Sequence, residues 1–92
     1  MVYIDAVEMA GGTGHEHIAR LHWVDGTERN WATRQEMVNF LSSETNHAYV
    51  RDGQGQVEVL AVLNAHPQYV RTHRDGRFTD NLLHLPGGPY HQ

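Results

Sequence analysis

One helix-start signal constrains what this chain can fold into. Thr33-Arg34-Gln35-Glu36 has the pattern of a capping box, in which the Thr hydroxyl and the Glu carboxylate each accept from a free backbone amide. The next apolar residues share one helical face: Met37, Val38, Phe40 and Leu41. We therefore predict one helix that begins at Thr33 and ends near Ser42 to Glu44.

Short alternating runs on both sides of this helix predict strands. Asp25-Gly26-Thr27 is a strong hairpin signal, and Asp75-Gly76 predicts a second turn. Trp23 is expected to face the core. The six expected strands cover residues 2–9, 17–24, 28–33, 47–52, 56–64 and 68–74. Residues 78–86 are expected as one helical turn or an extended closing strand, and residues 87–92 as a loose, flexible tail.

This order, β-β-β-α-β-β-β, predicts an α+β domain in which one helix packs on a small, mostly antiparallel sheet. The 92 residues suffice for a single domain spanning residues 1–92. The sequence has no cysteine, which excludes disulfides and cysteine-based zinc sites and fits a reducing cytoplasm. It has no apolar run near the ~20 residues of a membrane helix. Its first residues lack the features of a signal peptide, so we expect a cytoplasmic protein.

Charge and motif content leave few function classes with direct support. The net charge is −4, and all seven basic residues are arginine, so general nucleic-acid binding through phosphates is not expected. Catalysis has little support, since Thr72 and His73 are adjacent on a strand and point to opposite faces. We expect no cofactor.

Eight histidines raise the possibility of a metal site. His15 and His17 lie two residues apart and would share a face in an extended segment. With Glu16 or Asp75 as a carboxylate partner, they are candidate zinc ligands. The alternative is that they are surface or hydrogen-bonded histidines without a metal.

Arginines near the end of the chain form a candidate binding surface. Arg71, Arg74 and Arg77 cluster near Tyr69 and Phe78, and such a group can recognise an anion or an acidic partner. The alternative is that Arg71 pairs with Asp75 or Asp80 and closes the fold. The residues alone favour neither.

Two segments resemble the DUF3892 family of small bacterial and phage proteins of unknown function. The early segment has Gly14, His15, His17 and Ile18, and the late one has Arg71, Thr72, Asp75, Gly76, Thr79, Asp80, Asn81, Leu82, Leu83, Leu85 and Pro86. In the family a cysteine often follows the Leu-Pro pair, where this chain has Gly87-Gly88. The resemblance implies no activity.

The resemblance also makes the late residues look like one structural unit, which we call the latch: Arg71, Asp75, Asp80, Asn81, Leu82 and Leu83. In this interpretation Asp80 or Asn81 caps a short turn, and Arg71 ties that turn to the sheet. The leucines, with Leu85, would cover one end of the core.

The leading functional hypothesis is a non-enzymatic protein–protein interaction module, including a phage-encoded accessory protein that acts on a host protein. Exposed edge strands would offer strand addition to a partner or pairing into a homodimer. The second hypothesis is a metal- or small-ligand-binding domain that uses His15, His17 and a carboxylate. The third is a nucleic-acid binder that uses Tyr69, Arg71, Arg74 and Arg77.

Overall fold

The computed structural model describes residues 1–91, in which one α-helix and two short 3₁₀ helices accompany a seven-stranded sheet. The strands are β1 (Val2–Met9), β2 (Ile18–Asp25), β3 (Glu28–Thr33), β4 (Ala48–Asp52), β5 (Gly55–Val62), β6 (Tyr69–Arg74) and β7 (Arg77–Thr79). The helices are α1 (Arg34–Leu41), η1 (His15–His17) and η2 (Asn81–His84). This confirms the predicted α+β class with a mostly antiparallel sheet and one packed helix.

Three local features complete or correct the predicted elements. The capping box is present: the Thr33 hydroxyl accepts from the Glu36 amide at 3.1 Å, and the Glu36 carboxylate accepts from the Thr33 amide at 2.9 Å. Residues 78–86 contain both forms that the sequence left open, because the end of β7 is followed by the η2 turn. The prediction that the second strand starts at His17 is wrong, because His17 ends the 3₁₀ helix η1.

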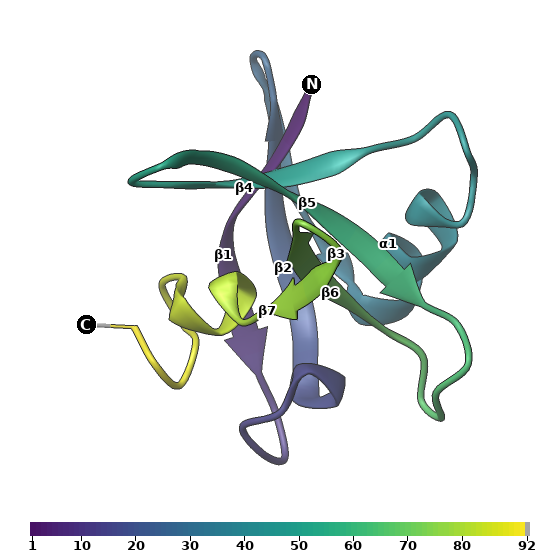
Figure 1. Cartoon of the computed structure of the whole chain (residues 1–92). Helices are drawn as coiled ribbons and strands as arrows, with labels where there is room; N and C mark the ends of the chain where they lie inside the picture. Colours follow the sequence, from purple (N-terminus) through teal and green to yellow (C-terminus); the bar gives the residue numbers. More distant parts are fainter. Residues whose placement is uncertain (92) are drawn as a thin grey trace.

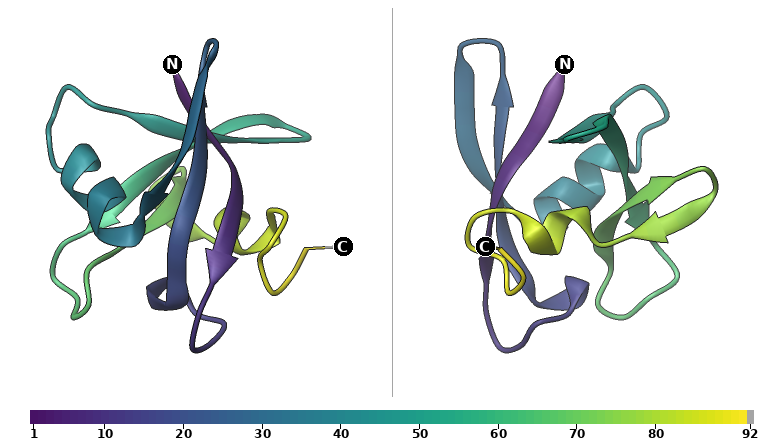
Figure 2. Two further views of the ribbon diagram at one scale, coloured as in Figure 1. Left: turned by 180° about the vertical axis from the view of Figure 1, so that it is seen from behind. Right: turned by 60° about the vertical axis from the view of Figure 1, so that its left-hand side comes forward.

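The sheet has the strand order β3-β2-β1-β4-β5-β6-β7. Its neighbours are antiparallel except for β1 and β4, which run parallel and pair only through Val2–Ala48 and Tyr3–Tyr49. Beyond this short junction β1 and β4 separate. Figures 1 and 2 show strands β1–β3 crossing strands β4–β7 rather than running beside them.

The core fills the space between these two groups of strands, with α1 and η2 packed against it. It contains Ile4, Val7, Ile18, Leu21, Met37, Val38, Ala48, Val50, Val57, Val59, Val70, Leu82 and Leu83. Trp23 packs against this core but is only partly buried. Phe40 also stays outside it, with an exposed fraction of 36%, although it belongs to the apolar stripe of α1. No helix within residues 1–91 is long and apolar enough to cross a bilayer.

The C-terminal segment lies along the part of β1 that β4 leaves. The Val7 amide donates to the Pro86 carbonyl at 3.0 Å. Gly87 has φ +88°, and a Cβ at this position would lie 1.8 Å from the Val7 carbonyl oxygen. Residues 87–91, expected as a loose tail, make backbone hydrogen bonds to η2 and its end, including Tyr90 to Leu83 at 3.0 Å. Gln92 lies outside the described residues.

The contact at Gly87 predicts an unusually costly substitution. Gly87→Ala should lower the free energy of unfolding by about 3 kcal/mol, because it adds a clash with backbone to the strain of a positive φ. Gly26→Ala is the matched control, since Gly26 has φ +63° and a Cβ there would meet no atom within 4 Å. The control should cost about 1 kcal/mol. Urea unfolding measures both, and equal losses would show that Gly87 is not packed on β1.

Candidate functional site

Arg71 on β6 connects the sheet to the segment that precedes η2. Its Nη2 donates to Asp80 Oδ1 at 2.8 Å, and its Nε donates to the Thr79 carbonyl at 3.3 Å. The guanidinium also lies 5.3 Å from the centroid of the Phe78 ring. Of the two carboxylates considered from the sequence, Arg71 therefore contacts Asp80. Asp75 instead occupies the β6–β7 turn with φ +53°.

The expected side-chain cap on the η2 turn is not present. Asp80 is the N-cap residue of η2, but its carboxylate makes no capping hydrogen bond. This carboxylate accepts from Arg71 instead. The Asn81 side chain also turns away, toward neighbouring strands. The prediction that Asp80 or Asn81 caps this turn is therefore wrong, because both side chains bond to other elements.

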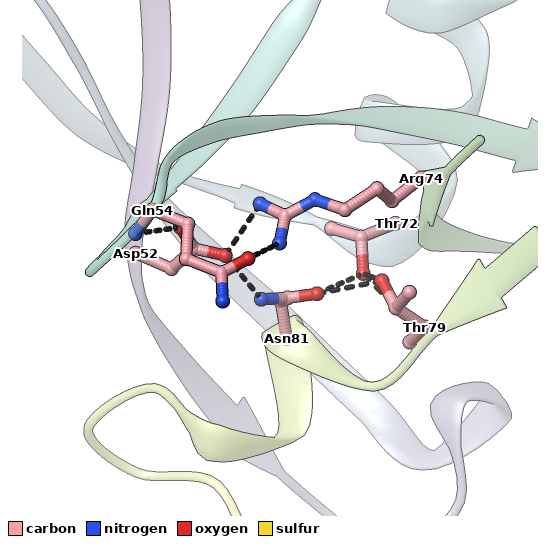
Figure 3. Close-up of polar contacts among 6 residues, drawn as sticks. All are labelled: Asp52, Gln54, Thr72, Arg74, Thr79 and Asn81. Carbon is pink, nitrogen blue, oxygen red and sulfur yellow. Dashed lines mark hydrogen bonds and ion pairs between the residues drawn. The ribbon is translucent and has the colours of Figure 1, made fainter.

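Asn81 lies at the centre of a polar network that joins η2 to three strands and the β4–β5 turn (Figure 3). Its Oδ1 accepts from the Thr79 hydroxyl at 2.6 Å and from the Thr72 hydroxyl at 3.3 Å. Its Nδ2 donates to Asp52 Oδ2 at 3.3 Å. Thr72 is fully buried, so its hydroxyl depends on these protein partners for its hydrogen bonds.

Arg74 completes this network from the end of β6. Its Nη2 donates to Asp52 Oδ2 and its Nη1 to Gln54 Oε1, both at 2.7 Å. The hydrogen bond from the Gln54 backbone amide has the largest effect in lowering the pKa of Asp52, and Arg74 and Asn81 lower it further. Partial desolvation acts in the opposite direction. Sequence reasoning missed Asp52 and Gln54, because a polar residue in a Gly-containing hairpin turn is ordinary.

The candidate arginine surface is divided by the alternation of β6. Tyr69 and Arg71 lie on one face of the strand, whereas Thr72 and Arg74 lie on the other. Arg71 and Arg74 are each paired with a carboxylate, and Arg77 is exposed at the β7 end of the turn. The four residues Tyr69, Arg71, Arg74 and Arg77 therefore do not form one continuous cationic surface.

His15 is buried beside the Arg71–Asp80 pair. Its Nε2 lies 3.8 Å from Asp80 Oδ1 and has no hydrogen-bond partner, and its ring stacks on Tyr69 with 6.1 Å between centroids. Burial lowers the pKa of His15, and Arg71 lowers it further, while Asp80 and Glu16 act in the opposite direction. The imidazole is therefore neutral at pH 7 and packed as an apolar group.

The condition for a shared histidine face is not met. His15 and His17 lie in the 3₁₀ helix η1 rather than in a strand, and His17 Nδ1 lies 3.3 Å from Glu16 Oε1. Within residues 1–91, no group of three or more His, Cys, Asp or Glu side chains is arranged to hold a metal ion. The positively charged guanidinium of Arg71 is already paired with the Asp80 carboxylate, and it would repel a metal cation at that carboxylate.

A groove of about 750 Å³ lies at a different place, between the β2–β3 hairpin, α1 and the chain that enters β4. Its apolar lining consists of Met1, Val2, Trp23, Ala32, Met37, Phe40 and Tyr49. Three carboxylates also line it: Asp25, Glu28 and Glu36. Hydrogen bonds from Thr33, that of its backbone amide first, lower the pKa of Glu36, which is therefore ionised at neutral pH. Trp23 and Phe40 stand out in the sequence as large apolar residues. The local patterns around them could not show that both line one groove.

The Arg71 contacts predict a measurable role in stability. Arg71→Ala should lower the free energy of unfolding by about 1 kcal/mol, since the pair with Asp80 is partly exposed and one carbonyl bond is also lost. For a domain of this size that corresponds to a fall in Tm of roughly 4–8 °C. Arg77→Ala is the control, because Arg77 is exposed. A Tm equal to that of the control would reject the latch.

The buried state of His15 predicts a pH dependence of stability. Because the folded-state pKa of His15 is lowered, the unfolded chain binds the proton more readily. The contribution of neutral, buried His15 to the free energy of unfolding is fully present above about pH 6.5. It is lost as the pH falls through the folded-state pKa. Denaturant unfolding at several pH values between 7.5 and 5 gives the free energy of unfolding at each pH. The slope of this free energy against pH should be smaller for His15→Gln than for the exposed-residue control His66→Gln. Identical slopes would contradict this assignment.

Comparison with known proteins gives one match. A family model described as a protein of unknown function, DUF3892, matches residues 3–86 of the 92. A search of curated proteins and a search of solved structures each found no match. The matched range contains both segments on which the resemblance was based, as well as the strands, helix and groove between them. The chain therefore belongs to the DUF3892 family.

Proposed function

We propose that this chain is a non-enzymatic protein-interaction module whose docking surface is the groove beside α1. The occupant is an apolar segment of a partner protein that carries basic residues at its flanks. The observation that supports this proposal is an apolar floor bordered by carboxylates in one groove. A cytoplasmic setting belongs to the same proposal, which the cysteine-free sequence fits.

The floor of the groove has the composition of an interaction site. Trp23, Met37, Phe40 and Tyr49 come from three different elements, β2, α1 and β4, and meet there. Aromatic residues and Met are enriched where protein partners bury surface, and aromatic anchors contribute much of the binding energy. Phe40 stays 36% exposed in the isolated chain, so a partner that covers it gains apolar burial.

The border of the groove favours a basic partner. Glu28 and Glu36 are exposed carboxylates, whereas the Asp25 carboxylate is already paired with the Met1 ammonium group at 3.0 Å, so the preference rests on the two glutamates. The net charge of the chain is −4, so its overall field also attracts cations. Charge complementarity of this kind raises the association rate and selects against acidic partners.

The other hypotheses have weaker support. The arginine surface proposed for nucleic acid is interrupted by the pairs Arg71–Asp80 and Arg74–Asp52. Strand addition has less support at β7, which has only three residues. A ligand site at His15 has one supporting observation, the unpartnered Nε2 atom.

The groove proposal is tested by titration with designed peptides and NMR detection. Twelve-residue peptides with a Leu/Phe centre and Lys flanks should shift the Trp23 indole and Tyr49 signals, and the same peptides with Glu flanks should bind at least tenfold more weakly. Phe40→Ser should weaken binding about tenfold or more. Phe78→Ser, which removes an exposed aromatic residue outside the groove lining, should leave the affinity unchanged.

Two results would contradict the proposal. Equal affinity for Lys-flanked and Glu-flanked peptides would remove the role of the acidic border. Peptide binding that leaves the Trp23 and Tyr49 signals in place would show that the groove is not the docking surface.

A further inference from the structure

We infer that the groove receives its partner segment as an α-helix, and not as a strand added to the sheet. This inference rests on the proposed function and specifies the conformation of the ligand. The supporting observation is that most backbone amides around the groove already have hydrogen-bond partners, above all along the edge strand β3.

The register of the β2–β3 hairpin determines which β3 amides are free for strand addition. Gly26 and Thr27 form a two-residue loop, so the pair Asp25–Glu28 that closes it is a hydrogen-bonded pair. Hydrogen-bonded and non-hydrogen-bonded pairs then alternate along an antiparallel ladder. The amides that point away from β2 are those of Arg29, Trp31 and Thr33, and an added strand would have to use them.

Side chains of the same protein already bond to two of these three amides. The Trp31 amide donates to Asn30 Oδ1 at 2.8 Å, and the Thr33 amide donates to Glu36 Oε1 at 2.9 Å. Of these three amides, this leaves that of Arg29 as a free donor. The outward carbonyls of the edge can still accept, but a regular antiparallel ladder alternates donors and acceptors, and the donors are mostly taken. Proteins protect edge strands against pairing between chains, and amides that already have partners act in the same direction.

The remaining walls of the groove are also occupied in backbone hydrogen bonding. At Trp23, β2 pairs with β1 and β3, and at Tyr49, β4 pairs with β1 and β5. In the loop after α1, the Asn46 amide donates to the Ser43 carbonyl at 3.2 Å, and its side chain donates to the Phe40 carbonyl at 3.1 Å. These walls therefore offer a partner mainly side chains.

A partner segment buried in such a groove must satisfy its own backbone groups. An α-helix does so internally, and it presents apolar residues at i, i+4 and i+7 along one face. The ligand class is therefore an amphipathic helix. Its apolar face contacts Trp23 and Phe40, and its basic residues face Glu28 and Glu36.

Two peptides that differ at one position test this inference. The first is a 14-residue, Ala-based peptide with Leu at three positions of one helical face and Lys at both ends. In the second peptide one central Ala is replaced by Pro, which breaks a helix. The two peptides therefore differ in their ability to form a helix. We expect the helical peptide to bind at least tenfold more tightly, with shifts of the Trp23 indole and no new protection of the Arg29 amide from hydrogen exchange.

A variant of the edge strand provides the second arm. Asn30→Ala removes the acceptor of the Trp31 amide and so opens the β3 edge. The affinity of the helical peptide should not change. A tighter complex with Asn30→Ala, or slower exchange of the Arg29 and Trp31 amides on binding, would show strand addition and overturn the inference.

The outcomes separate the two proposals. If both peptides bind equally, with shifts at Trp23 and loss of binding in Phe40→Ser, the helical inference is wrong and the interaction module stands. If neither peptide binds, both are wrong.

Discussion

The short parallel contact between β1 and β4 is the constraint on which the rest of this structure depends. Only Val2 and Tyr3 of β1 pair with β4, and the two strands then separate. A sheet that opens in this way exposes backbone groups and apolar side chains on both sides of the opening. Those groups must be covered, because buried backbone amides without partners are costly. The C-terminal segment covers β1, where Val7 bonds to Pro86, and α1 packs against β2 and β3 of one group of strands and β5 and β6 of the other.

The two sides of the core are closed with different chemistry. On the η2 side, Leu82 and Leu83 are buried, and a network centred on Asn81 fixes them to the strands. Each side chain of that network has at least one hydrogen-bond partner within it, which favours a defined structure. On the α1 side the contacts are mainly apolar. The helix has eight residues, and Phe40 near its end remains partly exposed and lines the groove together with Trp23.

The local elements could be predicted because their signals are local. The capping box, the Asp25-Gly26 hairpin and the alternating strands each depend on residues close in sequence. They appear within two residues of the expected positions. The sites could not be predicted in the same way. Asp52 and Asn81 meet across 29 residues, and Trp23 meets Phe40 only because β2 and α1 pack together. The expected cap by Asp80 failed for a related reason, since a distant cation, Arg71, takes its carboxylate.

The groove beside α1 is open in the isolated chain. The apolar residues around it come from separate elements, and the chain between α1 and β4 is held by bonds such as Asn46 to the Phe40 carbonyl. That bond holds the loop at the end of α1, where Asn46 itself lines the groove. In the proposed function, a segment of a second molecule covers these aromatic residues. Under that proposal, the segment would gain apolar burial that the fold itself does not supply, and the carboxylates of Glu28 and Glu36 would favour a basic segment.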